Sequence, residues 1–169
     1  MQSSARLFEL DVPEYAGSLA ELECIIRNRM TVDRVVYSRL EKDLNISDTY
    51  LRKFHKQGHE VCINILNRLA NCFDIRYELS NQEHFLPDKA FDAHNITELR
   101  DQLREKIQKT GARRVARLSS VSHTWVSKFA RGEVEICFKR LHDISIVLGV
   151  KYKLSNFTED AIFKKMIPN

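Results

Sequence analysis

The feature that most constrains the fold of this chain is an internal repeat. Residues 47–81 align without a gap on residues 122–156, at a constant offset of 75. A repeat of this length indicates one small domain present twice, so the function must be sought in that domain and in its duplication. Eleven of the 35 aligned pairs are identical: Ser47/Ser122, Thr49/Thr124, Lys53/Lys128, Phe54/Phe129, Glu60/Glu135, Cys62/Cys137, Leu66/Leu141, Tyr77/Tyr152, Leu79/Leu154, Ser80/Ser155 and Asn81/Asn156.

The length of 169 residues suits two domains of about 65 residues each. Domains this small are individually marginal, so we expect them to dock on each other or on a partner. Pro87 and several polar residues mark a linker between them. We therefore expect an N-terminal extension at 1–17, a first repeat at 18–81, the linker at 82–95, a second repeat at 96–156 and a C-terminal amphipathic tail at 157–169.

Apolar spacing predicts four helices in each repeat. In the second repeat, Leu99, Leu103 and Ile107 recur every four residues and mark one face of a helix that Thr97 opens and Gly111 ends. The further helices predicted there lie at residues 113–118, 122–130 and 138–148. Those of the first repeat lie at residues 22–30, 33–44, 47–56 and 61–73.

Each repeat ends in a segment that alternates apolar and charged residues. Residues 75–79 and 150–154 carry Ile or Val, Tyr and Leu on one face, a pattern that predicts a strand. A lone strand leaves its backbone groups unpaired. We therefore expect the two strands of one chain to pair antiparallel, with residues 7–12 as a weaker third strand. In the rival arrangement, these strands or the tail at 158–167 pair two chains into a homodimer.

Residues 111–132, GARRVARLSSVSHTWVSKFARG, resemble the helix-turn-helix of the lambda-repressor/Cro-like family. Ala116 is small where two helices cross closely, and Val121 leads from the turn into the core. Apolar anchors of the two helices lie at Val115, Val126 and Phe129. The turn departs from the family pattern at Ser120, where Gly is most common.

The resemblance implies a mainly α fold of two tandem four-to-five-helix domains, each followed by a short strand that joins a small sheet. In the family, the helix after the turn lies in the DNA major groove. Trp125, next to the buried Val126, is expected to be an amphipathic ring partly packed in the core. The positions that match base contacts are Ser122, His123, Thr124, Ser127 and Lys128. The positions that match phosphate contacts, which set affinity but not sequence choice, are Arg113, Arg114, Arg117 and Arg131.

The first repeat fits the family pattern less well. Glu41 falls where Ala116 falls, and a long acid fits poorly at a tight helix crossing. Asp43 and Asp48 add negative charge, whereas Arg39 and His55 join the basic residues around the third helix. Two interpretations stay open: this repeat also contacts DNA, or it is a scaffold for the second. Its candidate contacts are Ser47, Thr49, Arg52, Lys53 and Lys56.

The positive charge is concentrated in the second repeat. Residues 96–156 carry thirteen Lys and Arg against six Asp and Glu, whereas residues 18–81 carry ten against nine. Such an asymmetry is typical of a polyanion-binding surface.

No catalytic or metal-binding pattern is found in the sequence. The four cysteines form no CxxC pair, the six histidines share no metal-ligand spacing, and Cys62 and Cys137 are expected to be small core residues. No apolar run approaches the roughly 20 residues of a membrane span. We therefore expect no enzyme, no cofactor, no metal and no membrane contact, and reduced thiols favour the cytosol.

The sequence thus favours a sequence-specific regulator of transcription that binds double-stranded DNA, in the repressor class. The alternatives are an antitoxin or antirepressor-type interaction module that also binds DNA, and a DNA-bending accessory protein. The expected partners are double-stranded DNA, a protein partner, and either a second copy or the other half of an intramolecular pseudo-dimer. The expected location is the nucleoid in the cytoplasm of a bacterial or phage-infected cell.

Overall fold

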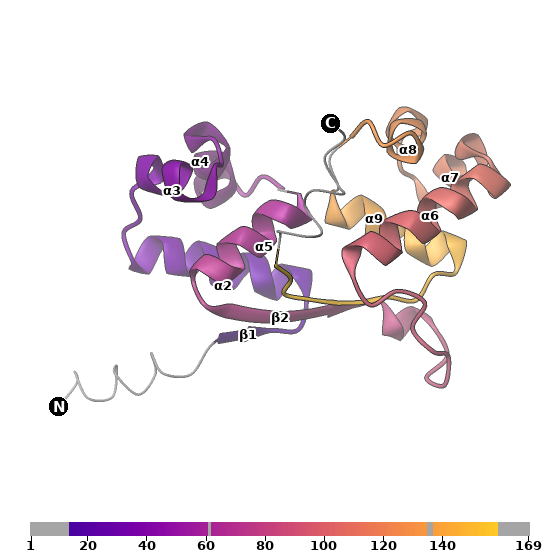
Figure 1. Cartoon of the computed structure of the whole chain (residues 1–169), viewed down its shortest axis with the longest axis horizontal. Helices are drawn as coiled ribbons and strands as arrows, with labels where there is room; N and C mark the ends of the chain where they lie inside the picture. Colours follow the sequence, from indigo (N-terminus) through magenta and orange to yellow (C-terminus); the bar gives the residue numbers. More distant parts are fainter. Residues whose placement is uncertain (1–13, 61, 135–136, 159–169) are drawn as a thin grey trace.

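The computed structural model of the chain describes residues 14–60, 62–134 and 137–158. These residues form a mainly helical structure with eight α-helices and a small three-stranded sheet. In Figure 1 the helices of the two repeats stand side by side, and the sheet runs beneath both. The predicted strand at 7–12 and the predicted tail, apart from its first two residues, lie outside the described residues.

Both repeats have the same order of four helices followed by a strand, and the first repeat has strand β1 in addition at its start. The first contains β1 (Glu14–Ala16), α2 (Leu19–Val32), α3 (Tyr37–Leu44), α4 (Asp48–Gln57), α5 (Ile63–Cys72) and β2 (Ile75–Ser80). The second follows a short 3-10 helix, η1 (Gln82–His84), and contains α6 (Ile96–Thr110), α7 (Ala112–Ser119), α8 (His123–Ala130), α9 (Phe138–Leu148) and β3 (Lys153–Ser155). The four helices predicted for each repeat are therefore present.

Several predicted helix starts differ from the observed ones. Helix α2 begins at Leu19, three residues before its predicted start, because Ser18 caps it. Two more starts differ for local reasons. The second helix of the first repeat begins at Tyr37 and not at residue 33, because Arg34 has a φ of +49° and breaks the helix. Helix α6 begins at Ile96, because Asn95 and not Thr97 caps it. The Glu98 N–H donates to Asn95 Oδ1 at 2.8 Å, and Glu98 Oε2 accepts from the His94 N–H at 3.0 Å. This reciprocal arrangement resembles a capping box.

The sheet has the order β1-β2-β3. Strands β2 and β3 pair antiparallel, which confirms that the terminal strands of the two repeats pair within one chain. The third strand, β1, pairs parallel with β2. Strand β3 begins three residues later than predicted, because Tyr152 forms an isolated parallel bridge with Ala93 of the linker segment.

The antiparallel pairing places repeat-equivalent residues opposite each other. Leu79 faces Leu154, its own counterpart at the offset of 75, and Cys62 faces Cys137 in an isolated antiparallel bridge. Residues that face their own equivalents lie on a two-fold axis. We call this axis, defined by these two pairs, the local two-fold axis.

Asn81 and Asn156 repeat the same hydrogen bonds on the two sides of this axis. Asn81 Oδ1 accepts from the Tyr152 N–H at 2.8 Å, and its Nδ2 donates to the Val150 carbonyl at 2.8 Å. Asn156 Oδ1 accepts from the Tyr77 N–H, and its Nδ2 donates to the Ile75 carbonyl, both at 2.9 Å. Each repeat therefore clamps the backbone of the other.

The structural repeat is longer than the sequence repeat. Upstream of α3 the offset becomes 77, because the first repeat has two additional residues between its first two helices. At this offset Ser18 and Asn95 are both N-caps. Arg27 and Arg104 also correspond: their Nε atoms donate to the carbonyls of Phe54 and Phe129 at 2.9 and 3.0 Å.

One hydrophobic core extends through both repeats. Phe54 and Phe129 are fully buried equivalents, and Leu66 and Leu141 are a second buried pair. The core continues across the local two-fold axis through Leu79 and its partner. Within the described ranges, none of the helices has the length and apolar character needed to cross a bilayer.

Candidate nucleic-acid interface

Each repeat contains two short helices joined by a tight turn. We call α3 with α4 the first helix pair, and α7 with α8 the second helix pair. In both turns a residue adopts the left-handed conformation: Asn45 has a φ of +54° and Ser120 a φ of +59°. Ser47 and Ser122 then cap the following helices, because their Oγ atoms accept from the backbone N–H groups of Tyr50 and Trp125. The two turns therefore have matching geometry.

The apolar anchors predicted for the second helix pair are buried. Val115, Val126 and Phe129 have no exposed surface, and Ala116 and Val121 are each 9% exposed. The poor fit predicted for Glu41, the counterpart of Ala116, does not arise because this side chain is exposed.

The base-contact candidates lie on the outer surface of α8. Ser122, His123, Thr124 and Lys128 are exposed, and Ser127 is half-buried. Ser127 Oγ lies 3.2 Å from His123 Nε2. The hydroxyl of Ser122 remains free to donate although it caps the helix. These five positions therefore offer hydroxyl, imidazole and ammonium groups along one helix.

The phosphate-contact candidates lie on α7, the helix before the turn, and just after α8. Arg113, Arg114 and Arg117 are exposed on α7 and have no ion pair among the described residues. Arg131, just after α8, pairs with Glu133 at 3.1 Å. Three guanidinium groups without a carboxylate partner on one short helix form a surface suited to phosphate oxygens.

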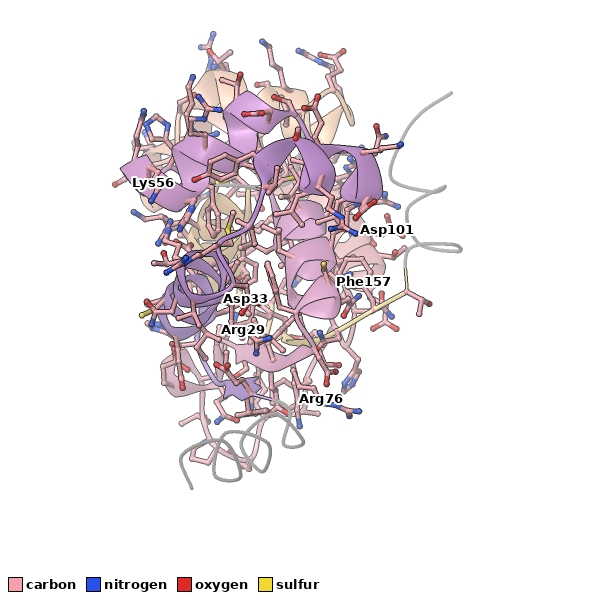
Figure 2. The ribbon with its side chains drawn as sticks, turned by 90° about the vertical axis from the view of Figure 1, so that its left-hand side faces the viewer. Arg29, Asp33, Lys56, Arg76, Asp101 and Phe157 are labelled. Carbon is pink, nitrogen blue, oxygen red and sulfur yellow. The ribbon has the colours of Figure 1, made fainter. Side chains whose placement is uncertain are left out.

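The first helix pair is less basic. Ser47, Thr49, Lys53 and Lys56 are exposed. Arg52 is also exposed, but it pairs with Asp48 at 3.0 Å. Figure 2 shows Lys56, in the last turn of α4, in the upper part of the molecule, whereas Arg76 of β2 lies in the lower part.

His55, which the sequence groups with the basic residues around α4, has a structural role. Its two ring nitrogens lie 2.7 Å from Thr31 Oγ1 and from the Tyr37 hydroxyl. Burial lowers the pKa of His55, and the nearby Lys56 and Arg27 lower it further. The ring therefore joins three helices of the first repeat as a neutral group.

Trp125 packs into the core at the edge of α8, as the sequence predicts. Its ring is 8% exposed and stacks on Phe129, with ring centroids 5.1 Å apart. The Arg140 guanidinium lies 5.5 Å from the centre of the Trp125 ring. Its counterpart Tyr50 is half-buried.

The two helix pairs lie on the same side of the molecule, opposite the sheet (Figure 1). Between α4 and α8 is a surface pocket of about 460 Å³, lined by Tyr50, Glu60, Cys62, Trp125, Val134, Cys137 and Arg140. Tyr50 with Trp125 and Cys62 with Cys137 are repeat equivalents. The pocket therefore lies on the local two-fold axis.

Sequence reasoning gave no role to Asn81 and Asn156, which fix how the two helix pairs are oriented. Their identity at the same position of both repeats was the available signal.

Among the described residues no cluster of three His, Cys, Asp or Glu side chains has a geometry suited to a metal ion. No family model matches the chain, and no curated protein or solved structure is significantly similar to it.

Proposed function

We propose that the chain is a sequence-specific double-stranded DNA-binding protein that acts as a repressor and carries two lambda-repressor-like helix-turn-helix units in one polypeptide. The observation that carries the proposal is the local two-fold axis, which presents two similar helix pairs on one side of the molecule. Dimeric helix-turn-helix proteins use such an axis to insert two helices into successive major grooves. Helices α4 and α8 are then the two reading helices.

The charge distribution supports unequal roles for the two reading helices. Helix α7 supplies, next to α8, three arginines that have no ion pair within the described part of the chain. In the first helix pair, Ser38 replaces Arg113, and Asp48 replaces His123 at the start of the reading helix. Phosphate contacts supply much of the affinity for DNA. The second repeat therefore contributes more affinity than the first.

One observation favours the alternative function of a protein-interaction module. Val32, the last residue of α2, and Val36, the N-cap of α3, are 74% and 61% exposed at the two ends of the turn that the first repeat has lengthened. Exposed neighbouring apolar residues are typical of a protein contact. This surface belongs to the first repeat alone, so it is compatible with DNA binding by the second.

Selection of binding sites from random duplex DNA with the full-length chain tests the proposal. Thr124→Ala should change the selected sequence and cost about 1–3 kcal/mol at the preferred site. Arg113→Ala should weaken binding to all DNA sequences alike. It should also reduce the slope of log affinity against log salt concentration by about 1.

Arg76→Ala is the matched control, because Arg76 is exposed on the sheet side of the molecule. It should leave the affinity nearly unchanged. Absence of any enriched sequence, with no salt-dependent binding to duplex DNA, would refute the proposal.

A further inference from the structure

The helices that follow the two reading helices begin at equivalent cysteines. Cys62 is the N-cap of α5, and Cys137 is the N-cap of α9. The two residues face each other across the local two-fold axis as antiparallel bridge partners, and both side chains are reduced thiols. Cys24 and Cys72 are exposed on helices α2 and α5 and serve as a comparison.

The backbone geometry of this bridge suits a disulfide. Directly opposed residues of an antiparallel pair have Cα atoms about 4.5–5.5 Å apart, and their side chains leave on the same side. A disulfide needs a Cα separation of about 4.4–6.8 Å and a Cβ separation of about 3.5–4.5 Å. The Cα separation of such a pair therefore already fits, and the two Cβ atoms need only a small approach.

A small oxidant can reach the pair from solvent. Both cysteines line the pocket between α4 and α8. Cys137 is half-buried, and its Sγ donates to Glu60 Oε2 at 3.3 Å, whereas Cys62 is buried. Cys137 is therefore the thiol that meets the oxidant first.

We propose that Cys62 and Cys137 are joined by a hydroperoxide into a disulfide that ties the two repeats together between the reading helices. The Cys137 thiol gives its proton to water, and the thiolate sulfur attacks one oxygen of hydrogen peroxide. The O–O bond breaks, leaving a sulfenic acid and a hydroxide that takes the proton and departs as water. The Cys62 sulfur then attacks the sulfenic sulfur, the S–O bond breaks, and the departing hydroxide takes the Cys62 proton to become the second water. Two thiols and one peroxide thus give one disulfide and two waters.

The disulfide acts on DNA recognition through the spacing of the reading helices, a consequence that rests on the proposed function. Each cysteine directly precedes the helix that follows a reading helix, so a cross-link there limits how far α4 and α8 move apart. The oxidised chain should therefore reject sites with one inserted base pair between the two half-sites severalfold more strongly than the reduced chain.

The test uses the full-length chain carrying Cys24→Ser and Cys72→Ser, so that only the proposed pair remains. Treatment with hydrogen peroxide should lower the intact mass by about 2 Da and give one peptide pair joined through Cys62 and Cys137. The melting temperature should rise by several degrees, and dithiothreitol should reverse both changes. Burial raises the pKa of the Cys137 thiol, with Glu60 adding to the rise and Arg140 opposing it, so the reaction should accelerate as the pH rises.

Two further variants separate the roles of the residues. With Cys62→Ser, oxidation should stop at an oxygen adduct on Cys137 without a cross-link. With Glu60→Gln, which also removes the partner of Lys139, the Cys137 thiol loses a carboxylate that raises its pKa, so the disulfide should form faster at a given pH. Peptide mapping of the unaltered four-cysteine chain gives the same answer if a serine variant does not fold.

Sulfinic acid on Cys137 without the intramolecular cross-link, or cross-links only between chains, would overturn the proposal. The mass measurement does not depend on DNA. A disulfide in a chain that fails to bind any duplex would therefore refute the proposed function and leave the thiol chemistry established. A disulfide that leaves the spacing preference unchanged would refute its effect on recognition.

Discussion

At the scale of single residues, two asparagines hold the repeats in register. Asn81 has no exposed surface, and its amide bonds the Tyr152 N–H, the Val150 carbonyl and Ser145 Oγ. These bonds are not part of the ladder between β2 and β3, because Val150 and Tyr152 precede the first residue of β3. The amide side chain thus extends the contact between the repeats.

Asn81→Ala should lower the free energy of unfolding by about 2–4 kcal/mol, since buried backbone groups would lose their partners at about 1–3 kcal/mol each. Urea unfolding followed by circular dichroism measures this loss. The matched control is Asn28→Ala, because Asn28 is exposed on α2 and its amide contacts only Cys24 Sγ, at 3.9 Å, among the described residues. Equal stabilities of the two variants would show that the clamp contributes nothing.

The repeats differ at one buried hydrogen bond, which makes the second sensitive to acid. In the first repeat the Tyr77 hydroxyl donates to Asn67 Oδ1 at 2.7 Å. In the second, His142 occupies the position of Asn67, and its Nδ1 lies 2.6 Å from the Tyr152 hydroxyl. Burial lowers the pKa of His142 from its ordinary value of 6.5, and the nearby His84 lowers it further. The carboxylates of Asp143 and Glu83 act in the opposite direction.

Because the folded pKa lies below the unfolded one, the unfolded chain takes up the proton first as the pH falls below about 6.5. The stabilising effect of neutral His142 is therefore complete above that pH and is lost in acid. His142→Asn, which introduces the residue type of the first repeat, should reduce the loss of stability between pH 7.5 and pH 5. Urea unfolding at the two pH values measures it. An unchanged pH dependence would assign the acid sensitivity to His55, whose pKa is also lowered.

At the scale of elements, the turn of the second helix pair depends on an unfavourable backbone conformation. Ser120 has a φ of +59°, a region that costs a residue with a Cβ atom about 1–2 kcal/mol. Asn45 at the equivalent turn belongs to a residue type that tolerates this region better. In the helix-turn-helix pattern that this segment resembles, Gly at this position avoids the same strain.

Ser120→Gly should therefore raise the free energy of unfolding by about 0.5–1 kcal/mol, since Gly removes the strain and loses some entropy on folding. Thermal unfolding measures the change. Ser38→Gly serves as the control, because an exposed Gly inside α3 should cost about 0.5–1 kcal/mol. Destabilisation by both substitutions would contradict the strained turn.

The sequence predicted the helices well, because apolar spacing such as that of Leu99, Leu103 and Ile107 directly reflects burial on one face. It predicted the antiparallel pairing of the terminal strands because the alternating pattern occurs twice and each copy lacks a local partner. It missed the start of α3, which a single positive φ at Arg34 determines. The gapless alignment at the offset of 75 did not reach the first third of the repeat, because two extra residues shift the offset and the identities there are few.

The candidate interface was predictable to a similar degree. The exposure of the α8 positions follows from their place opposite the apolar anchors of the same helix. The inward position of His55 could not be predicted, since its partners Thr31 and Tyr37 belong to other helices. The sequence also could not predict that Cys62 and Cys137 face each other. Their proximity depends on how the two repeats pack together and not on the sequence of either repeat.

At the scale of the whole molecule, the local two-fold axis makes one chain the counterpart of a symmetric dimer. A chain with both reading helices should need no second copy to bind two half-sites about 34 Å apart, one turn of the duplex. Because the reading helices are unequal, the preferred site should be asymmetric, with a well-defined half under α8 and a degenerate half under α4.

This asymmetry should be removable with two substitutions. The five base-contact candidates of the second repeat have counterparts in the first at the offset of 75. Three of the five pairs are already identical: Ser47, Thr49 and Lys53 match Ser122, Thr124 and Lys128. The remaining two positions differ, and in α4 they form the Asp48–Arg52 ion pair at 3.0 Å. Asp48→His with Arg52→Ser gives both helices the same five residues. Both positions lie on the surface of α4, so the fold should be retained.

Selection from random duplex DNA should return an asymmetric site for the unaltered chain and a palindrome for the double variant, in which the half-site of α8 appears twice. Each new hydrogen bond to a base edge should contribute about 1–3 kcal/mol, because the new half-site is read by the same groups. The control is Arg76→Ser on the sheet side, which should select the same site as the unaltered chain. An asymmetric site for the double variant, identical to that of the unaltered chain, would mean that α4 does not read bases and that the first repeat is a scaffold for the second.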